Sequence, residues 1–214
     1  MGKCHYTRAF TLLELLVVIS VILLLVGFLL PALTRTKAAS QTAKCTGQLR
    51  QVGIAMAGYA HDHSEFLPTA HDAIPWSSLD PAAWTRELFS YFQTTNLLSC
   101  PAFRGVYNNS LFNYFMGSRA AFVDAGGRAA AVQVSRIHFP SEYILSGDTN
   151  FAFQEDDADP DNYTQDTLFG TPSPVHRGRL NVLFADLHVQ SFFRFDSNSM
   201  TYAYSQPGMA WDFP

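Results

Sequence analysis

The segment from Phe10 to Leu33 constrains this chain more than any other part of its sequence. It holds about two dozen residues of almost unbroken apolar character, and its one charged residue is Glu14. An α-helix rises about 1.5 Å per residue, so a helix of this length crosses a hydrocarbon core of about 30 Å. We therefore expect the chain to be inserted in a membrane or exported across one. The residues after Leu33 then form the part that this helix carries.

Glu14 lies near the start of the apolar segment, just after a short basic leader. A charge within an apolar span costs about 2.5–3.5 kcal/mol on insertion scales, so an acid here is expected to have a partner or a function. The leader ends in Arg8 and the small residue Ala9, directly before Phe-Thr-Leu-Leu-Glu. An ordinary signal peptide is cut after its apolar core, at an A-x-A-like site. No such site follows here, because the run ends in Pro-Ala-Leu-Thr-Arg.

This layout resembles the cleavage site of type IV prepilins and type II secretion pseudopilins. The resemblance implies that a prepilin peptidase cuts between Ala9 and Phe10, and that Phe10 becomes an N-methylated terminus. It also implies that Glu14 pairs with the N-terminal amine of a neighbouring pilin-like subunit in a filament. Ala9 stands where the family usually has Gly, and we expect slower processing at this residue. The alternative is a plain signal anchor with an isolated acid near its polar end.

The resemblance also implies a topology. It places the N-terminus in the cytoplasm, a single span in the bacterial cytoplasmic (inner) membrane, and the head in the periplasm or outside the cell. Charge counting does not decide the orientation, because Lys3 and Arg8 precede the span whereas Arg35, Lys37 and Lys44 follow it.

Beyond the anchor, the 214-residue chain is long enough for one globular head of ordinary size. Its formal net charge of −4, without a basic stripe in the head, gives no indication of nucleic-acid binding. Cys4 lies in the leader and is lost on processing. Cys45 and Cys100 remain in a region expected outside the cytoplasm, where an even pair indicates a disulfide. Two free buried thiols are the alternative.

The sequence predicts that the membrane helix continues past Leu33 to about residue 60. One stripe of mainly apolar residues recurs at spacings of three and four, which is typical of an amphipathic helix: Cys45, Leu49, Val52, Met56 and Tyr59. We therefore expect residues 1–9 to be a cleaved leader, 10–33 the transmembrane part of the helix, 34–60 its amphipathic part, and 61–214 an extracytoplasmic head.

Within the head, the pattern favours helix first and strands later. Asp80 and Pro81 are typical of a helix start, which predicts a second helix from Pro81 to about Phe92. Alternating runs predict strands at 131–138 and 142–146, and a β-hairpin from 180–185 and 188–193. The expected fold class is α+β, with the long helix packed on an antiparallel sheet in a pilin-like arrangement.

The C-terminal part carries a further resemblance. His176 and Asp186 are spaced as in a subfamily of prepilin-like proteins with a C-terminal H-x9-DG motif, although Leu187 stands where that motif has Gly. Glycine supplies positive φ at low cost and leucine does not, so we expect the hairpin turn to differ in type. The subfamily has no settled biochemical activity to transfer.

Two groups of residues are candidate metal sites. Asp157, Asp159 and Asp161 can converge on Ca²⁺, which prefers oxygen ligands, and related major pseudopilins bind calcium in a head loop. A solvated acidic loop is the alternative. His176, Asp186 and His188, together with Asp148, are a second candidate. Its alternative is structural: Asp186 caps the hairpin turn, and His176 hydrogen-bonds a backbone group.

No catalytic motif is present: the sequence lacks G-x-S-x-G, a Walker loop, H-E-x-x-H and a dinucleotide fingerprint. The sequence therefore favours a non-enzymatic, pilin-like structural subunit over a tethered metal-dependent hydrolase. The second hypothesis is a monomeric, membrane-tethered module that binds a polymer such as polysaccharide. It rests on aromatic residues expected at the surface: Trp76, Trp84, Trp211, Tyr202 and Tyr204.

Overall fold

The computed structural model describes residues 11–71, 73–103, 112–149, 157–161 and 175–205. The chain divides into two compact units, residues 1–40 and residues 41–214, which we call the anchor unit and the head. Helix α1 (Leu12–Asp62, 51 residues) begins in the anchor unit and ends in the head. The long helix predicted from the sequence is therefore present, and it continues through Pro31.

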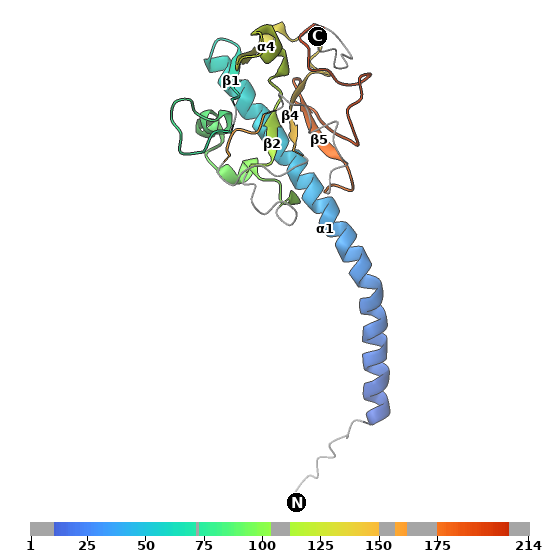
Figure 1. The fold of residues 1–214 in the computed structure, drawn as a ribbon. Helices are drawn as coiled ribbons and strands as arrows, with labels where there is room; N and C mark the ends of the chain where they lie inside the picture. The colour runs from blue at the N-terminus through green and yellow to red at the C-terminus, as the bar shows by residue number, and fades with distance from the viewer. Residues whose placement is uncertain (1–10, 72, 104–111, 150–156, 162–174, 206–214) are drawn as a thin grey trace, which may run out of the picture. The chain divides into compact units, whose positions relative to one another are not determined.

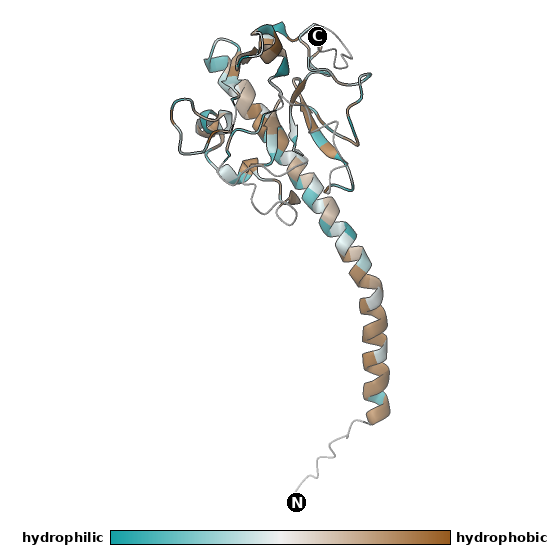
Figure 2. Cartoon of the chain, viewed as in Figure 1, coloured by the Kyte–Doolittle hydropathy of each residue, from teal (hydrophilic) through white to brown (hydrophobic). Residues whose placement is uncertain are grey.

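The anchor unit presents apolar side chains around the whole helix. Leucine, isoleucine and valine side chains between Leu12 and Leu33 are exposed, and Figure 2 shows this part of α1 almost uniformly brown. By its length and composition, α1 has a segment that can cross a membrane. A helix that is apolar on all sides needs either lipid or other apolar helices around it.

The second half of α1 has a buried face in the head. Cys45, Leu49, Val52 and Met56 of the predicted stripe are fully buried, and Tyr59 packs against the same core. The other face of this half carries polar and exposed residues such as Lys44 and Arg50. The amphipathic pattern therefore identified correctly which face of the helix packs on the head.

Within the described part of the head, the strands form two antiparallel sheets (Figure 1). The smaller pairs β1 (Phe66–Thr69) with β3 (Ala131–Gln133). The larger has the strand order β2-β4-β5-β6, formed by β2 (Tyr114–Met116), β4 (Ile144–Asp148), β5 (Leu180–Phe184) and β6 (Val189–Phe192). The predicted hairpin is the β5–β6 pair, with Leu180 opposite Phe192.

The central strands β4 and β5 of the larger sheet are buried along their whole length and face a core on each side. Alternate side chains of a strand point to opposite faces. Leu183 of β5 lies in the core that contains α1, whereas Val182 and Phe184 lie in a second core with Met200 and Tyr202 from the C-terminal segment. The fold class is therefore α+β with the helix packed against an antiparallel sheet, as the sequence predicts.

The predicted helix from Pro81 to Phe92 is wrong in its start and its continuity. Two short helices, α2 (Trp84–Glu87) and α3 (Phe89–Phe92), replace it. Ala83 is extended, with φ −61° and ψ 142°, so the helix cannot begin at Pro81. Remaining short elements are η1 (Thr95–Leu98), α4 (Arg119–Asp124) and η3 (Val134–Arg136), the last of which ends the strand predicted over 131–138.

Candidate functional site

The start of α1 is organised by a hydrogen-bonded pair. The Thr11 backbone N–H and its hydroxyl both donate to Glu14 Oε2, at 2.9 and 2.8 Å, and the Glu14 N–H donates to Thr11 Oγ1 at 3.3 Å. This reciprocal pattern is a capping box, which satisfies N–H groups that the first helical turn leaves without partners. Within this single chain the carboxylate of Glu14 is exposed and caps its own helix. The predicted cleavage residues Ala9 and Phe10 lie outside the described residues.

His176 lies in a buried cluster that also contains the two cysteines. Cys45 and Cys100 form a disulfide with an S–S distance of 2.04 Å. The His176 Nε2 atom is 3.2 Å from Cys100 Sγ and 3.5 Å from Asp148 Oδ2, and its Nδ1 is 2.9 Å from the Thr42 hydroxyl. These residues come from α1, the loop after η1, the end of β4 and the turn before β5. We call Cys45, Cys100, Asp148 and His176 the buried cluster.

Burial changes the pKa values of both titratable side chains of this cluster so that both are neutral between about pH 4 and pH 7. Removal from water raises the pKa of Asp148 to about 7, against the lowering effect of the hydrogen bonds that Asn181 donates to it. The same cause lowers the pKa of His176 to about 4. Near pH 5 the Asp148–His176 pair therefore carries its proton on the carboxyl group, because a charged pair is costly to bury.

The second motif residue, Asp186, lies in a different environment. Its Oδ1 accepts hydrogen bonds from the His188 backbone N–H at 3.1 Å and from His188 Nδ1 at 2.5 Å, on the partly exposed turn between β5 and β6. Leu187 adopts φ +70° within this turn. Asp186 thus caps the turn as the structural alternative proposed, and leucine occupies the conformation expected of glycine.

The structure separates the predicted His/Asp metal group. Among the described residues, one trio of His, Cys or acidic side chains has its ligand atoms mutually within 4.8 Å: Cys45, Cys100 and His176. Asp186 and His188 are not part of it. Within the described residues, the contacts of the His176 ring are with the side chains of Thr42, Cys100 and Asp148, and the predicted backbone partner is not among them. Sequence reasoning named Asp148 as a neighbour but missed Thr42, which no local pattern marks because it lies 134 positions from His176.

The three aspartates predicted to bind calcium lie in a buried segment, not in a solvated loop. Asp157 and Asp159 are almost fully buried, and the Asp159 N–H donates to Asp157 Oδ1 at 2.9 Å. The His71 N–H donates to Asp159 Oδ2 at 3.2 Å. Burial, with Asp161 and Asp157 nearby, raises the pKa of Asp159 to about 9. Among the described residues, the ligand atoms of these three aspartates do not all lie within 4.8 Å of one another. Calcium binding by them stays a prediction.

Ionisation of Asp159 is expected to destabilise the head. The ordinary aspartate value is 3.8, so between about pH 4 and pH 9 the folded state binds more protons than the unfolded state. The free energy of unfolding therefore falls as pH rises, by at most about 1.4 kcal/mol per pH unit from this group. Urea denaturation between about pH 7 and pH 9, above the pKa values of Asp148 and His176, checks this: Asp159→Asn is expected to remove the slope in this range and surface Asp124→Asn to keep it. A variant Asp159→Asn with an unchanged slope would contradict the assignment. If Ca²⁺ binds here, it should also flatten the wild-type slope.

The aromatic residues offered as a polymer-binding surface are mostly internal. Trp84 is fully buried, with its Nε1 donating to Pro160 O at 2.8 Å, and Tyr202 and Tyr204 are also buried. That part of the prediction is wrong, because these rings fill the core and are not available to a ligand. Trp211 lies outside the described residues.

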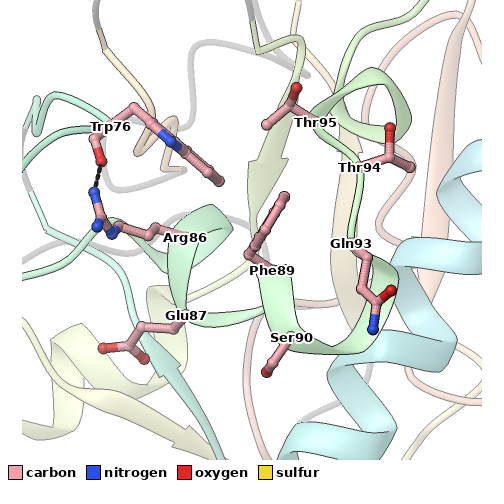
Figure 3. Close-up of a pocket in the computed structure, with 8 residues that line it drawn as sticks. All are labelled: Trp76, Arg86, Glu87, Phe89, Ser90, Gln93, Thr94 and Thr95. Atoms are coloured by element: carbon pink, nitrogen blue, oxygen red, sulfur yellow. Dashed lines mark hydrogen bonds between the residues drawn. The ribbon is translucent and has the colours of Figure 1, made fainter.

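Trp76 does line a surface cavity of about 650 Å³ (Figure 3). Its ring stacks on Phe112 at 5.6 Å and meets Phe89 edge to face at 5.5 Å. The Arg86 guanidinium donates to the Trp76 carbonyl and lies 5.9 Å from its ring. The remaining lining residues are polar or charged: Glu87, Ser90, Gln93, Thr94 and Thr95. An aromatic floor with a polar rim can bind a hydroxyl-rich ligand.

A long apolar helix that continues into an α+β head, with one acid close to its start, is consistent with a pilin-like fold. Comparison with known families finds a match at the N-terminal part of the chain. Residues 4–30 match the family model described as the prokaryotic N-terminal methylation motif. This match supports a pilin-like protein that is processed as a prepilin. No curated protein and no solved structure matches the chain.

Proposed function

We propose that the protein is a structural subunit of a type IV pilus-like filament or a type II secretion pseudopilus. The observation that carries the proposal is the methylation motif at residues 4–30, followed by an apolar helix with Glu14 as its one acid up to Leu33. In this proposal, prepilin peptidase cuts between Ala9 and Phe10 and Phe10 is N-methylated. The exposed apolar faces of the anchor units then pack against one another, which removes them from lipid.

The proposal includes a topology with the N-terminus in the cytoplasm and the head outside it. The disulfide between Cys45 and Cys100 supports an extracytoplasmic head, because disulfides persist in oxidising compartments. Membership of the H-x9-DG subfamily is part of the same proposal. Its motif residues divide between a buried cluster and a turn, which supports structural roles for both.

The mass of the protein extracted from bacterial membranes tests the processing step. We expect a chain that lacks residues 1–9 and begins with N-methylated Phe10. The chain with Ala9→Gly, which restores the residue usual at this position, should be processed at least as fast. Recovery of a chain that keeps its first nine residues, or of a soluble chain cut after the apolar segment, would overturn the proposal.

A second candidate function is the binding of an extracytoplasmic polymer, and the cavity at Trp76 favours it. Retention of the protein on insoluble polysaccharides would support this function, with Trp76→Ala expected to reduce retention and Phe66→Ala, an exposed aromatic outside the cavity, to leave it unchanged. Equal retention of both variants, or no retention of the wild type, would exclude the cavity as a sugar site.

A further inference from the structure

The buried cluster brings together four side chains whose chemistry matches a metal site. Cys45, Cys100 and His176 offer ligand atoms mutually within 4.8 Å, and Asp148 Oδ2 lies 3.5 Å from the same His176 nitrogen. We propose that, when the Cys45–Cys100 disulfide is reduced, a Zn²⁺ ion binds through both sulfur atoms and His176 Nε2, and that the carboxylate of Asp148, which lies outside this trio, moves in as the fourth ligand.

The two distances measured from His176 suit tetrahedral zinc, whereas Asp148 lies outside the trio whose ligand atoms are mutually within 4.8 Å and has to move toward the sulfur atoms. Zinc binds nitrogen and oxygen at about 2.0–2.2 Å and sulfur at about 2.3 Å, so neighbouring ligand atoms in a tetrahedral site lie roughly 3.3–3.8 Å apart. The His176–Asp148 separation of 3.5 Å falls in that range, and the Cys100–His176 separation of 3.2 Å is just below it. The sulfur atoms are closer only because they are bonded. Reduction breaks this bond and frees each sulfur to occupy its own coordination position.

Two further residues orient the proposed ligands. The Thr42 hydroxyl oxygen is 2.9 Å from His176 Nδ1, so it can accept a hydrogen bond from Nδ1–H and leave the Nε2 lone pair directed at the cluster. Asn181 donates from its backbone N–H and its side-chain amide to Asp148 Oδ2, both at 2.8 Å. Outer partners of this kind fix the tautomer and direction of metal ligands.

The buried cluster also contains a carboxylate oxygen of Asp148 that could accept a bond to a cation. Asp148 is fully buried, and within the described residues its Oδ1 atom has no hydrogen-bond donor. A buried carboxylate oxygen without a donor is costly unless a proton or a cation is beside it. A zinc ion held by the two sulfurs and His176 would supply that cation.

Reduction of the Cys45–Cys100 disulfide balances when a phosphine is the reductant. The S–S bond breaks, each sulfur takes up a proton, and the phosphine is oxidised to its oxide with an oxygen atom from water. Zinc then binds the two sulfurs as thiolates, and their two protons are released to solvent, because thiolate is the ligand form of cysteine. The disulfide and the metal-bound dithiolate are thus alternative states of one cluster.

The test uses the full chain in detergent, reduced with a phosphine under anaerobic conditions and titrated with Co²⁺. We expect one Co²⁺ per chain, with a thiolate-to-cobalt charge-transfer band and the d–d bands of a tetrahedral site, displaced by an equivalent of Zn²⁺. The oxidised chain should show neither band. Asp148→Asn and Thr42→Val should each weaken binding by about tenfold or more.

His176→Gln and His188→Gln form the matched pair. The first should lower cobalt affinity at least about tenfold and alter the d–d bands, whereas the second changes an exposed histidine and should do neither. Cys45→Ser combined with Cys100→Ser should abolish the charge-transfer band.

Three outcomes would overturn the proposal. One is a reduced wild-type chain, folded by circular dichroism, that shows no thiolate–cobalt band. Another is a His176→Gln variant with wild-type bands and affinity. The third is a reduced chain that is unfolded and stays unfolded when zinc is added, since a metal held by these four residues would restore the fold. None of these results bears on processing of the N-terminus, so the zinc site and the filament function fail separately.

Discussion

Replacement of Glu14 by Gln is expected to abolish filament assembly while leaving membrane insertion and processing intact. Glutamine keeps the size of the side chain and can still accept the hydrogen bonds from Thr11, so the helix cap survives. It removes the negative charge that the proposed function pairs with the methylated amine of a neighbouring subunit. In lipid that amine would then lack a counter-charge, which disfavours the packed state. Shearing of cells followed by quantification of the filament fraction measures the effect.

Two further variants separate charge pairing from helix capping. Thr11→Ala removes the cap but keeps the carboxylate, so it should assemble at near wild-type levels. Ser20→Ala removes another polar group of the same span, whose hydroxyl donates to Val17 O of its own helix at 2.8 Å, and this variant should also assemble. Assembly of Glu14→Gln at the wild-type level, or loss of assembly in Thr11→Ala alone, would show that Glu14 acts only on its own helix.

The features that the sequence predicted correctly depend on local periodicity. The long helix, the buried stripe from Cys45 to Met56 and the β5–β6 hairpin each follow from a repeat of 3.6 or 2 residues, which a sequence displays directly. The predicted Pro81 helix failed because Ala83 is extended and α2 begins only at Trp84, which the local start signals at Asp80 and Pro81 do not show.

The environment of His176 could not be predicted, for a different reason. Thr42, Asp148 and Asn181 come from separate elements, and only the strand order β2-β4-β5-β6 brings β4 and β5 together at Asp148. That order depends on long-range packing and leaves no mark on the sequence near His176. Trp84 and Tyr202 looked like surface aromatics because residue type alone does not distinguish a core ring from an exposed one.

The junction between β2 and β4 depends on the absence of a side chain at Gly117. Its N–H donates to Leu145 O at 2.9 Å and its carbonyl accepts from the buried Tyr143 hydroxyl at 3.1 Å. A Cβ atom at this position would lie 2.1 Å from the Ile144 carbonyl oxygen. Backbone atoms cannot move aside as a flexible side chain can, so an added methyl group must push the two strands apart.

We therefore expect Gly117→Ala to lower the free energy of unfolding of the head by about 3 kcal/mol or more, since overpacking and a lost buried hydrogen bond add together. The strand pairing that it disturbs places Tyr114 opposite Asp148, so the buried cluster should also lose its geometry. Gly47→Ala is the matched control: Gly47 is an exposed position of α1 with no atom within 4 Å of an added Cβ, and alanine should stabilise the helix by about 0.5–1 kcal/mol. Urea denaturation followed by tryptophan fluorescence measures both. Equal midpoints for the two variants would mean that β2 and β4 do not approach as closely as the structure shows.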